Sequence, residues 1–184
     1  MKRALISTVG TGQGVENGIW FSVKNQNPEL VFLVVTQTSL ATAEKLKAKF
    51  IENDIEYCFE ELTNENDVEI IFEECNIIIQ KILDKGFKKN QIIADYTSGT
   101  KSMSAALVLS AATFELENVS YVYGSQRDEN GRVVTGSERL SVLSPRVAFE
   151  IKLLEQFKLL FNKFQFQTAI SLFENQYFSS NREK

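Results

Sequence analysis

The chain of 184 residues contains no histidine. This absence excludes Ser-His-Asp and Cys-His triads, zinc sites built with histidine, and any histidine acting as a general acid or base. Cysteine is also scarce: Cys58 and Cys75 stand apart in apolar-rich segments and are not spaced as a CxxC pair. We therefore expect two reduced, buried thiols rather than a disulfide or a redox pair.

Glycine, proline and long apolar runs are few. Nine glycines and two prolines leave no low-complexity linker, and no run of about 18 apolar residues exists to span a bilayer. The apolar stretch near the N-terminus is too short for a signal sequence. With 43% hydrophobic and 24% charged residues, we expect a cytoplasmic protein with a real core and no membrane contact.

Positive charge is also limited. Twenty Lys and Arg oppose 24 Asp and Glu, which gives a net charge of −4 without any basic block. A protein that holds long DNA or RNA by its phosphates usually has a basic face. We therefore expect no long nucleic acid as a partner, and any phosphate-bearing ligand to be small and held by local features.

Apolar runs and helical patterns alternate over the first 125 residues, which predicts βα units and a parallel sheet. The strands are expected at residues 4–9, 30–36, 55–61, 91–95 and 120–123. The helices are expected at residues 15–25, 40–53, 68–85 and 101–116. Asn130-Gly131 then predicts a β-hairpin at one edge. The fold class is α/β, with a Rossmann-like, doubly wound sheet of order 3-2-1-4-5.

Composition changes after Pro145, so we expect a ligand-binding domain at residues 1–145 and a helical tail or connector at 146–184. The tail holds seven of the fourteen Phe in a purely helical pattern. Two explanations of its apolar surface stay open: packing on the sheet domain, or contact with a second subunit or further domain. A helix close to residue 184 also suits a chain that continues into an effector domain.

Two loops follow the strands that this order places side by side. They are residues 10–14, GTGQG, and residues 96–102, YTSGTKS. Each precedes a helix whose N-terminal N–H groups attract anions. One such loop is a common way to turn a strand into a helix, but two at the switch point favour a phosphate-binding crevice.

Familiar nucleotide motifs do not fit these loops. A GxGxxG fingerprint starting at Gly10 fails at Val15, and the acid expected after the second strand is replaced by Thr36-Gln37-Thr38. The Walker pattern fails because Thr100 precedes Lys101. A metal nuclease site with Asp95 would need a second carboxylate beside Lys101 to hold a metal pair, and the sequence has none there. We therefore expect no cofactor and no metal, and we give Asp95 a structural role as an acceptor for its own loop.

The run from Asp95 to Ala106, DYTSGTKSMSAA, together with Ser7 to Gly12, STVGTG, resembles the CRISPR-associated Rossmann-fold (CARF) domain. The nearest subgroup is that of the CARF ribonucleases of type III CRISPR systems, and the likeness covers about residues 1 to 145. The resemblance implies a homodimeric sensor of cyclic oligoadenylate, a ring of four or six adenylates, in antiviral defence. A two-fold dimer matches the symmetry of an even-numbered ring.

The resemblance and the loop chemistry together suggest ligand-binding residues. Lys101 would neutralise a phosphate, N–H groups of both loops would bind its oxygens, and residues 36–38 would read adenine edges. Two arginines of the hairpin would close over the ligand. The full expected set is Thr8, Gly10, Thr11, Gly12, Gln13, Thr36, Gln37, Thr38, Thr97, Ser98, Gly99, Thr100, Lys101, Arg127 and Arg132.

Some relatives in this family also cut the ring, by attack of a ribose 2′-OH on the adjacent phosphate. This reaction needs in-line geometry and charge stabilisation more than a strong base, so the missing histidine does not forbid it. The candidates for positioning and stabilisation are Thr11, Ser98 and Lys101, without metal. The effector site of the ribonuclease relatives uses Arg and His, so this chain cannot be that ribonuclease.

Two other hypotheses assign the chain to different functional classes. One is a nucleotide or sugar-phosphate hydrolase on the same fold. The other is a transcription regulator whose tail binds DNA, but a recognition helix needs basic and polar residues. The Phe-rich tail with few arginines argues against it.

Overall fold

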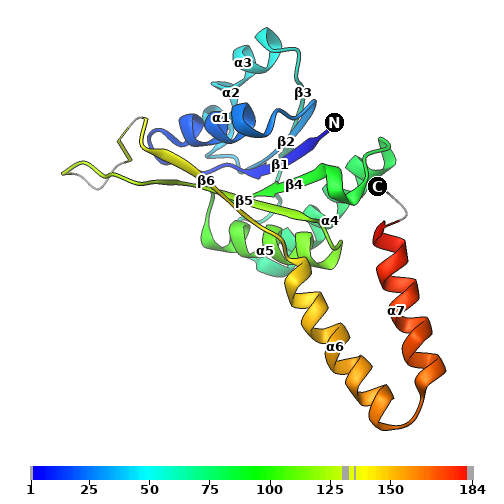
Figure 1. Cartoon of the computed structure of the whole chain (residues 1–184). Helices are drawn as coiled ribbons and strands as arrows, with labels where there is room; N and C mark the ends of the chain where they lie inside the picture. The colour runs from blue at the N-terminus through cyan, green and yellow to red at the C-terminus, as the bar shows by residue number, and fades with distance from the viewer. Residues whose placement is uncertain (1, 130–132, 135, 182–184) are drawn as a thin grey trace. The chain divides into compact units, whose positions relative to one another are not determined.

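The computed structural model describes residues 2–129, 133–134 and 136–181. The chain divides into two compact units, Met1–Pro145 and Arg146–Lys184. The strands are β1 (Ala4–Thr8), β2 (Leu30–Val35), β3 (Glu56–Glu61), β4 (Ile92–Asp95), β5 (Asn118–Gly124) and β6 (Glu138–Leu143). The α-helices are α1 (Val15–Gln26), α2 (Leu40–Glu44), α3 (Lys47–Glu52), α4 (Val68–Asp84), α5 (Lys101–Thr113), α6 (Arg146–Asn162) and α7 (Phe166–Asn181), with a 3₁₀ turn at Lys89–Gln91 (Figure 1).

The first unit is a six-stranded sheet of order β3-β2-β1-β4-β5-β6. The first five strands are parallel, and β6 runs antiparallel to β5. This confirms the Rossmann-like fold, the predicted strand order and the hairpin at the β5 edge. The Asn130-Gly131 turn that predicted the hairpin lies outside the described residues.

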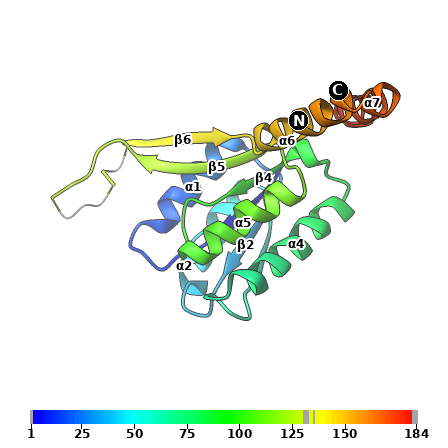
Figure 2. The same cartoon turned by 90° about the horizontal axis from the view of Figure 1, so that it is seen from below.

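Both faces of the sheet are covered, which explains why the central strands are apolar without alternation. In β2, Leu30, Phe32 and Val34 belong to a core with α4 and α5, whose helices lie together on one face (Figure 2). The intervening Val31, Leu33 and Val35 pack on the other face, against α1 and α3. Every residue of β1 and β2 is buried. Alternate side chains of β2 therefore enter two separate cores, one on each face of the sheet.

The helix expected at residues 40–53 was wrong as one element, because the structure has two short helices there. The N–H of Leu46 donates to Ala43 O at 2.9 Å, a tight turn that interrupts the α-helical ladder. Leu46 and Phe50 are both fully buried in the core beside α1. Helical periodicity did not anticipate this turn, because Leu46 and Phe50, four residues apart, also fit one face of a continuous helix.

The second unit consists of α6 and α7, which contact each other. The turn between them includes Phe164 with a φ of 58°. Phe161 lies at the centre of an aromatic cluster, with ring centroids 6.2 Å from Phe157 and 5.0 Å from Phe166. The expected helical pattern is therefore present as a helical hairpin. None of the described helices has the length and apolarity needed to cross a membrane.

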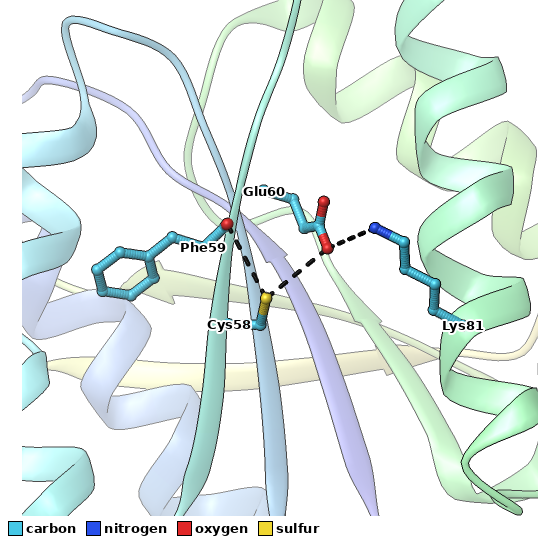
Figure 3. A network of polar contacts seen from close by, with 4 residues as sticks. All are labelled: Cys58, Phe59, Glu60 and Lys81. Atoms are coloured by element: carbon cyan, nitrogen blue, oxygen red, sulfur yellow. Dashed lines mark hydrogen bonds and ion pairs between the residues drawn. The ribbon is translucent and has the colours of Figure 1, made fainter.

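The two thiols differ in exposure. Cys75 is buried in α4, and burial raises its pKa to about 12. Cys58 on β3 is only half-buried, contrary to expectation, because β3 is the edge strand of the sheet. Its Sγ lies 3.7 Å from Glu60 Oε1, which Lys81 Nζ contacts at 2.7 Å (Figure 3). Burial and then the charge of Glu60 raise the pKa of Cys58, so both thiols are poor nucleophiles at neutral pH.

Candidate functional site

The two glycine loops meet directly. Ser7 pairs with Asp95 where β1 and β4 lie side by side, so both loops leave the sheet at the same edge. A Cβ placed on Gly10 would lie 2.9 Å from the backbone N of Gly99. Gly99 has a φ of +102°, and its own Cβ would lie 3.0 Å from Thr8 Cβ. Glycine at both positions therefore lets the two backbones touch.

Reciprocal hydrogen bonds fasten the loops together. The Thr8 hydroxyl donates to Ser98 O, and the Ser98 hydroxyl donates to Thr8 O at 2.6 Å. The N–H of Gly10 donates to Ser98 Oγ at 3.3 Å. Thr8 is fully buried, so its hydroxyl serves loop attachment and is not offered to a ligand. Ser98 still lines the cleft, but its hydroxyl hydrogen is already in use.

A cleft of about 370 Å³ opens beside this junction. Its volume is near the lower end of the range of about 300–1,000 Å³ that ligand pockets occupy. Polar loop residues form most of its wall, and three apolar side chains complete it. The lining residues are Val9, Gly10, Thr11, Gly12, Val15, Thr36, Thr38, Ser39, Glu65, Thr97, Ser98, Gly99, Thr100 and Met103.

The cleft is lined by backbone donors rather than basic side chains. Within the described chain, the N–H groups of Thr11, Gly12 and Gly99 donate no hydrogen bond. Helix α1 starts after Gly14 with no side-chain cap, and α5 starts after Thr100, whose hydroxyl accepts from Met103 N at 3.1 Å. Two helix N-termini and free N–H groups favour an anion here.

The structure brings most of the predicted residues to one cleft. Gly10, Thr11 and Gly12 meet Thr36, Thr38 and residues 97–100 there, whereas Gln13, Gln37 and Lys101 are not among its lining residues. Lys101 is the exposed first residue of α5 and joins none of the ion pairs of the described residues. In the hairpin, Arg127 forms a β-bridge with Val133, and Arg132 lies outside the described residues.

Sequence reasoning missed Glu65, which comes from the connection between β3 and α4. Thr100 Oγ1 donates to Glu65 O at 3.3 Å, and Ser102 Oγ donates to Asn66 O at 3.4 Å. These bonds fix the connection beside the start of α5. Strand order predicts only that the connection leaves the same sheet edge, so no sequence signal placed Glu65 in the cleft.

Asp95 holds the second loop, residues 96–102, by a hydrogen bond, as predicted. Its Oδ1 accepts from Thr97 N at 2.9 Å, and its Oδ2 accepts from the hydroxyls of Ser22 and Ser120. Gln26 Nε2 donates to both of those hydroxyl oxygens, at 2.7 and 3.0 Å, which directs their hydrogens toward Asp95. Burial raises the pKa of Asp95, which has no cationic partner in this network.

A larger hollow of about 830 Å³ lies at the opposite edge of the sheet, where the strands begin. It contains Lys85, which pairs with Glu56 at 2.7 Å, and Lys2, which lies 4.1 Å from the Phe87 ring centroid. Ligands of open α/β sheets bind at the carboxyl ends of the strands. The smaller cleft is therefore the candidate site.

The comparisons with known proteins agree with this fold. No family model matches the chain, and no curated protein does. Among solved structures, a type III CRISPR defence DNA nuclease activated by cyclic oligoadenylate matches with a TM-score of 0.55 at 16% identity, over 67% of this chain and 19% of that one. Can2 from Sulfobacillus thermosulfidooxidans, in complex with cyclic tetra-adenylate, matches with a TM-score of 0.52 at 16% identity, over 65% and 31%.

Protein VC1899 from Vibrio cholerae also matches, with a TM-score of 0.54 at 9% identity, over 66% of this chain and 30% of that one. The matches span less than a third of each of these three proteins. At these identities the similarity establishes the shared fold.

The Asp95 network makes stability depend on pH in a defined direction. Because burial raises the pKa of Asp95 above 3.8, folding takes up a proton between that value and the raised one. The stability that Asp95 contributes therefore falls as the pH rises through this window. Asp95→Asn would turn an amide donor toward hydroxyls already set as donors, which costs about 1–3 kcal/mol.

Urea unfolding across a pH series measures this effect. The deficit of Asp95→Asn relative to the unsubstituted protein should be largest at the acidic end and shrink as the pH rises. Asp54→Asn, at an exposed position, serves as the control and should show little difference. A deficit for Asp95→Asn that is constant or grows with pH would contradict the assignment.

Proposed function

We propose that this chain is a cyclic oligoadenylate sensor of type III CRISPR antiviral defence, acting in the cytoplasm. The observation that supports the proposal is the contact between Gly10 and Gly99, which lies beside a cleft lined by both loops. Two proteins that share the fold are a DNA nuclease activated by cyclic oligoadenylate and Can2 in complex with cyclic tetra-adenylate. Ring recognition is assigned to residues 1–145, and residues 146–184 to a connector toward an effector.

The charge of the cleft supports a phosphodiester ligand. Each phosphate of a cyclic oligoadenylate carries one negative charge, whereas the terminal phosphates of AMP or ATP carry more. Among the described residues that line the cleft, Glu65 alone is charged, and it is acidic. Backbone N–H groups and helix N-termini suit a singly charged phosphate without requiring a cation inside the cleft.

The size of the cleft supports a dimer. A cleft of about 370 Å³ cannot enclose four linked nucleotides, so one chain would hold only part of a ring. A second copy related by a two-fold axis would supply the matching cleft to a ring with an even number of adenylates. The homodimer is therefore part of the proposed binding site.

Lys101 is proposed to contact a phosphate from the rim of the site. A cation in the first turn of a helix opposes the helix dipole, so Lys101 does not favour the stability of α5. Its expected benefit comes from the ligand. Lys101→Ala should weaken ring binding by about 1.5–3 kcal/mol at each half of the site without lowering the melting temperature.

Calorimetry tests both the function and Lys101. Cyclic tri-, tetra- and hexa-adenylate should be titrated beside AMP and ATP, and we expect one ring per two chains with weak or absent mononucleotide binding. Lys24→Ala is the matched control, because Lys24 is exposed in the last turn of α1, at the other end of that helix. Preference for mononucleotides would support a hydrolase instead, and unchanged ring affinity in Lys101→Ala would remove Lys101 from the site.

We further propose that the protein opens the bound ring. A ribose 2′-oxygen would attack the neighbouring phosphorus, and the 5′-oxygen would leave with a proton, giving a 2′,3′-cyclic phosphate and a free 5′-hydroxyl. Thr11 is exposed and lines the cleft, so its hydroxyl is accessible to a phosphate. Ser98 also lines the cleft, and Lys101 is exposed at the start of α5. Long incubation of the ring with the protein in the presence of EDTA should yield linear products, which chromatography separates from the intact ring. An intact ring would leave a sensor without nuclease activity.

A further inference from the structure

Glu65 is an unexpected residue in an anion-binding cleft. It is half-buried, and it is the only charged residue among those that line the cleft. In the part of the chain that the structure describes, its carboxylate has neither a hydrogen-bond nor an ion-pair partner. Its backbone is held in place, because its carbonyl accepts from Thr100 Oγ1 at 3.3 Å.

A carboxylate accepts hydrogen bonds but donates none, so any ligand group that hydrogen-bonds to Glu65 must be a donor. The phosphates of the ligand offer no donor, and they repel a negative charge. A cyclic oligoadenylate carries two kinds of donor, the 6-amino group of adenine and the ribose 2′-hydroxyl. A ring that hydrogen-bonds to Glu65 would therefore do so through one of these groups.

The lining residues divide into two chemical groups. Gly10, Gly12 and Gly99 provide the backbone that suits phosphate, whereas Val15 is the partly exposed apolar residue against which the face of a base can rest, with Val9 and Met103 buried. The hydroxyls of Thr36 and Thr38 contact each other at 2.9 Å. Glu65 is thus the strongest acceptor among the lining residues, and its carboxylate suits the amino edge of a base that rests on Val15.

We propose that Glu65 accepts a hydrogen bond from the 6-amino group of a bound adenine and so favours adenine over a purine that lacks this group. This inference rests on the proposed function, since it needs a ring in the cleft. It adds a base-reading residue beside Thr36 and Thr38.

The test compares two rings that differ only at position 6 of the purine. The probes are the cyclic oligoadenylate that binds most tightly and a ring of the same size built from purine riboside, which has hydrogen in place of the 6-amino group and keeps N1 unprotonated. The unsubstituted protein should prefer the adenine ring by about tenfold or more. Glu65→Gln should weaken adenine-ring binding and lower the ratio of the two affinities, because a neutral amide oxygen is a weaker acceptor than a carboxylate.

Whether Glu65→Gln weakens or tightens ring binding distinguishes base recognition from a purely electrostatic effect. If Glu65 faces no ligand donor, removing its charge beside a polyanion should tighten the binding of both rings, which would overturn the proposal. Glu61→Gln removes a charge from the exposed end of β3, outside the cleft, and is the matched control. Glu65→Asp keeps the charge and serves as a second variant if Glu65→Gln unfolds.

Three further outcomes are distinct. Equal weakening of both rings by Glu65→Gln would indicate a ribose contact and overturn base reading while leaving the sensor function intact. A lack of preference between the rings in the unsubstituted protein would do the same. Failure of the unsubstituted protein to bind any ring would overturn the proposed function and this inference together.

Discussion

The site depends on the contact between two backbones, at Gly10 and Gly99. No side chain fits between them, since a Cβ on Gly10 would lie 2.9 Å from the N of Gly99. This closeness lets Thr8 and Ser98 exchange hydrogen bonds, while other N–H groups of both loops, from residues that line the cleft, have no partner among the described residues. The two helix N-termini can then act on the same anion. A wider separation would leave two ordinary strand-to-helix turns.

The second loop is hydrogen-bonded to two neighbouring strands, β4 and β5, at the carboxyl end of the sheet. Asp95 accepts from Thr97 N, and Thr97 Oγ1 accepts from Val122 N at 2.8 Å, where β5 extends past the end of β4. Val122 is also the register partner of Leu140 in β6. The cleft loop is therefore hydrogen-bonded to β5, the strand that pairs with β6 in the hairpin. The loop is consequently built into the sheet rather than attached loosely to it.

Much of this arrangement could be predicted from sequence. Buried, unalternating strands and right-handed crossovers fix the strand order, and that order brings residues 10–14 and 96–102 together. Side-chain directions could not be predicted in the same way: Thr8 turns into the core to bond Ser98, and Glu65 reaches the cleft through contacts of its connection with α5. The turn at Leu46 could not be predicted either, because the buried residues Leu46 and Phe50 have the spacing of one continuous helix.

An amide NMR titration with cyclic oligoadenylate tests most directly whether the glycine junction is the binding site. The account predicts that the largest shifts occur at the N–H groups of Thr11, Gly12 and Gly99, which lack partners within the described chain. The signals of Lys2 and Phe87, beside the larger hollow at the opposite edge, should stay nearly constant. Shifts concentrated at Lys2 and Phe87, with the glycine N–H groups unmoved, would contradict it.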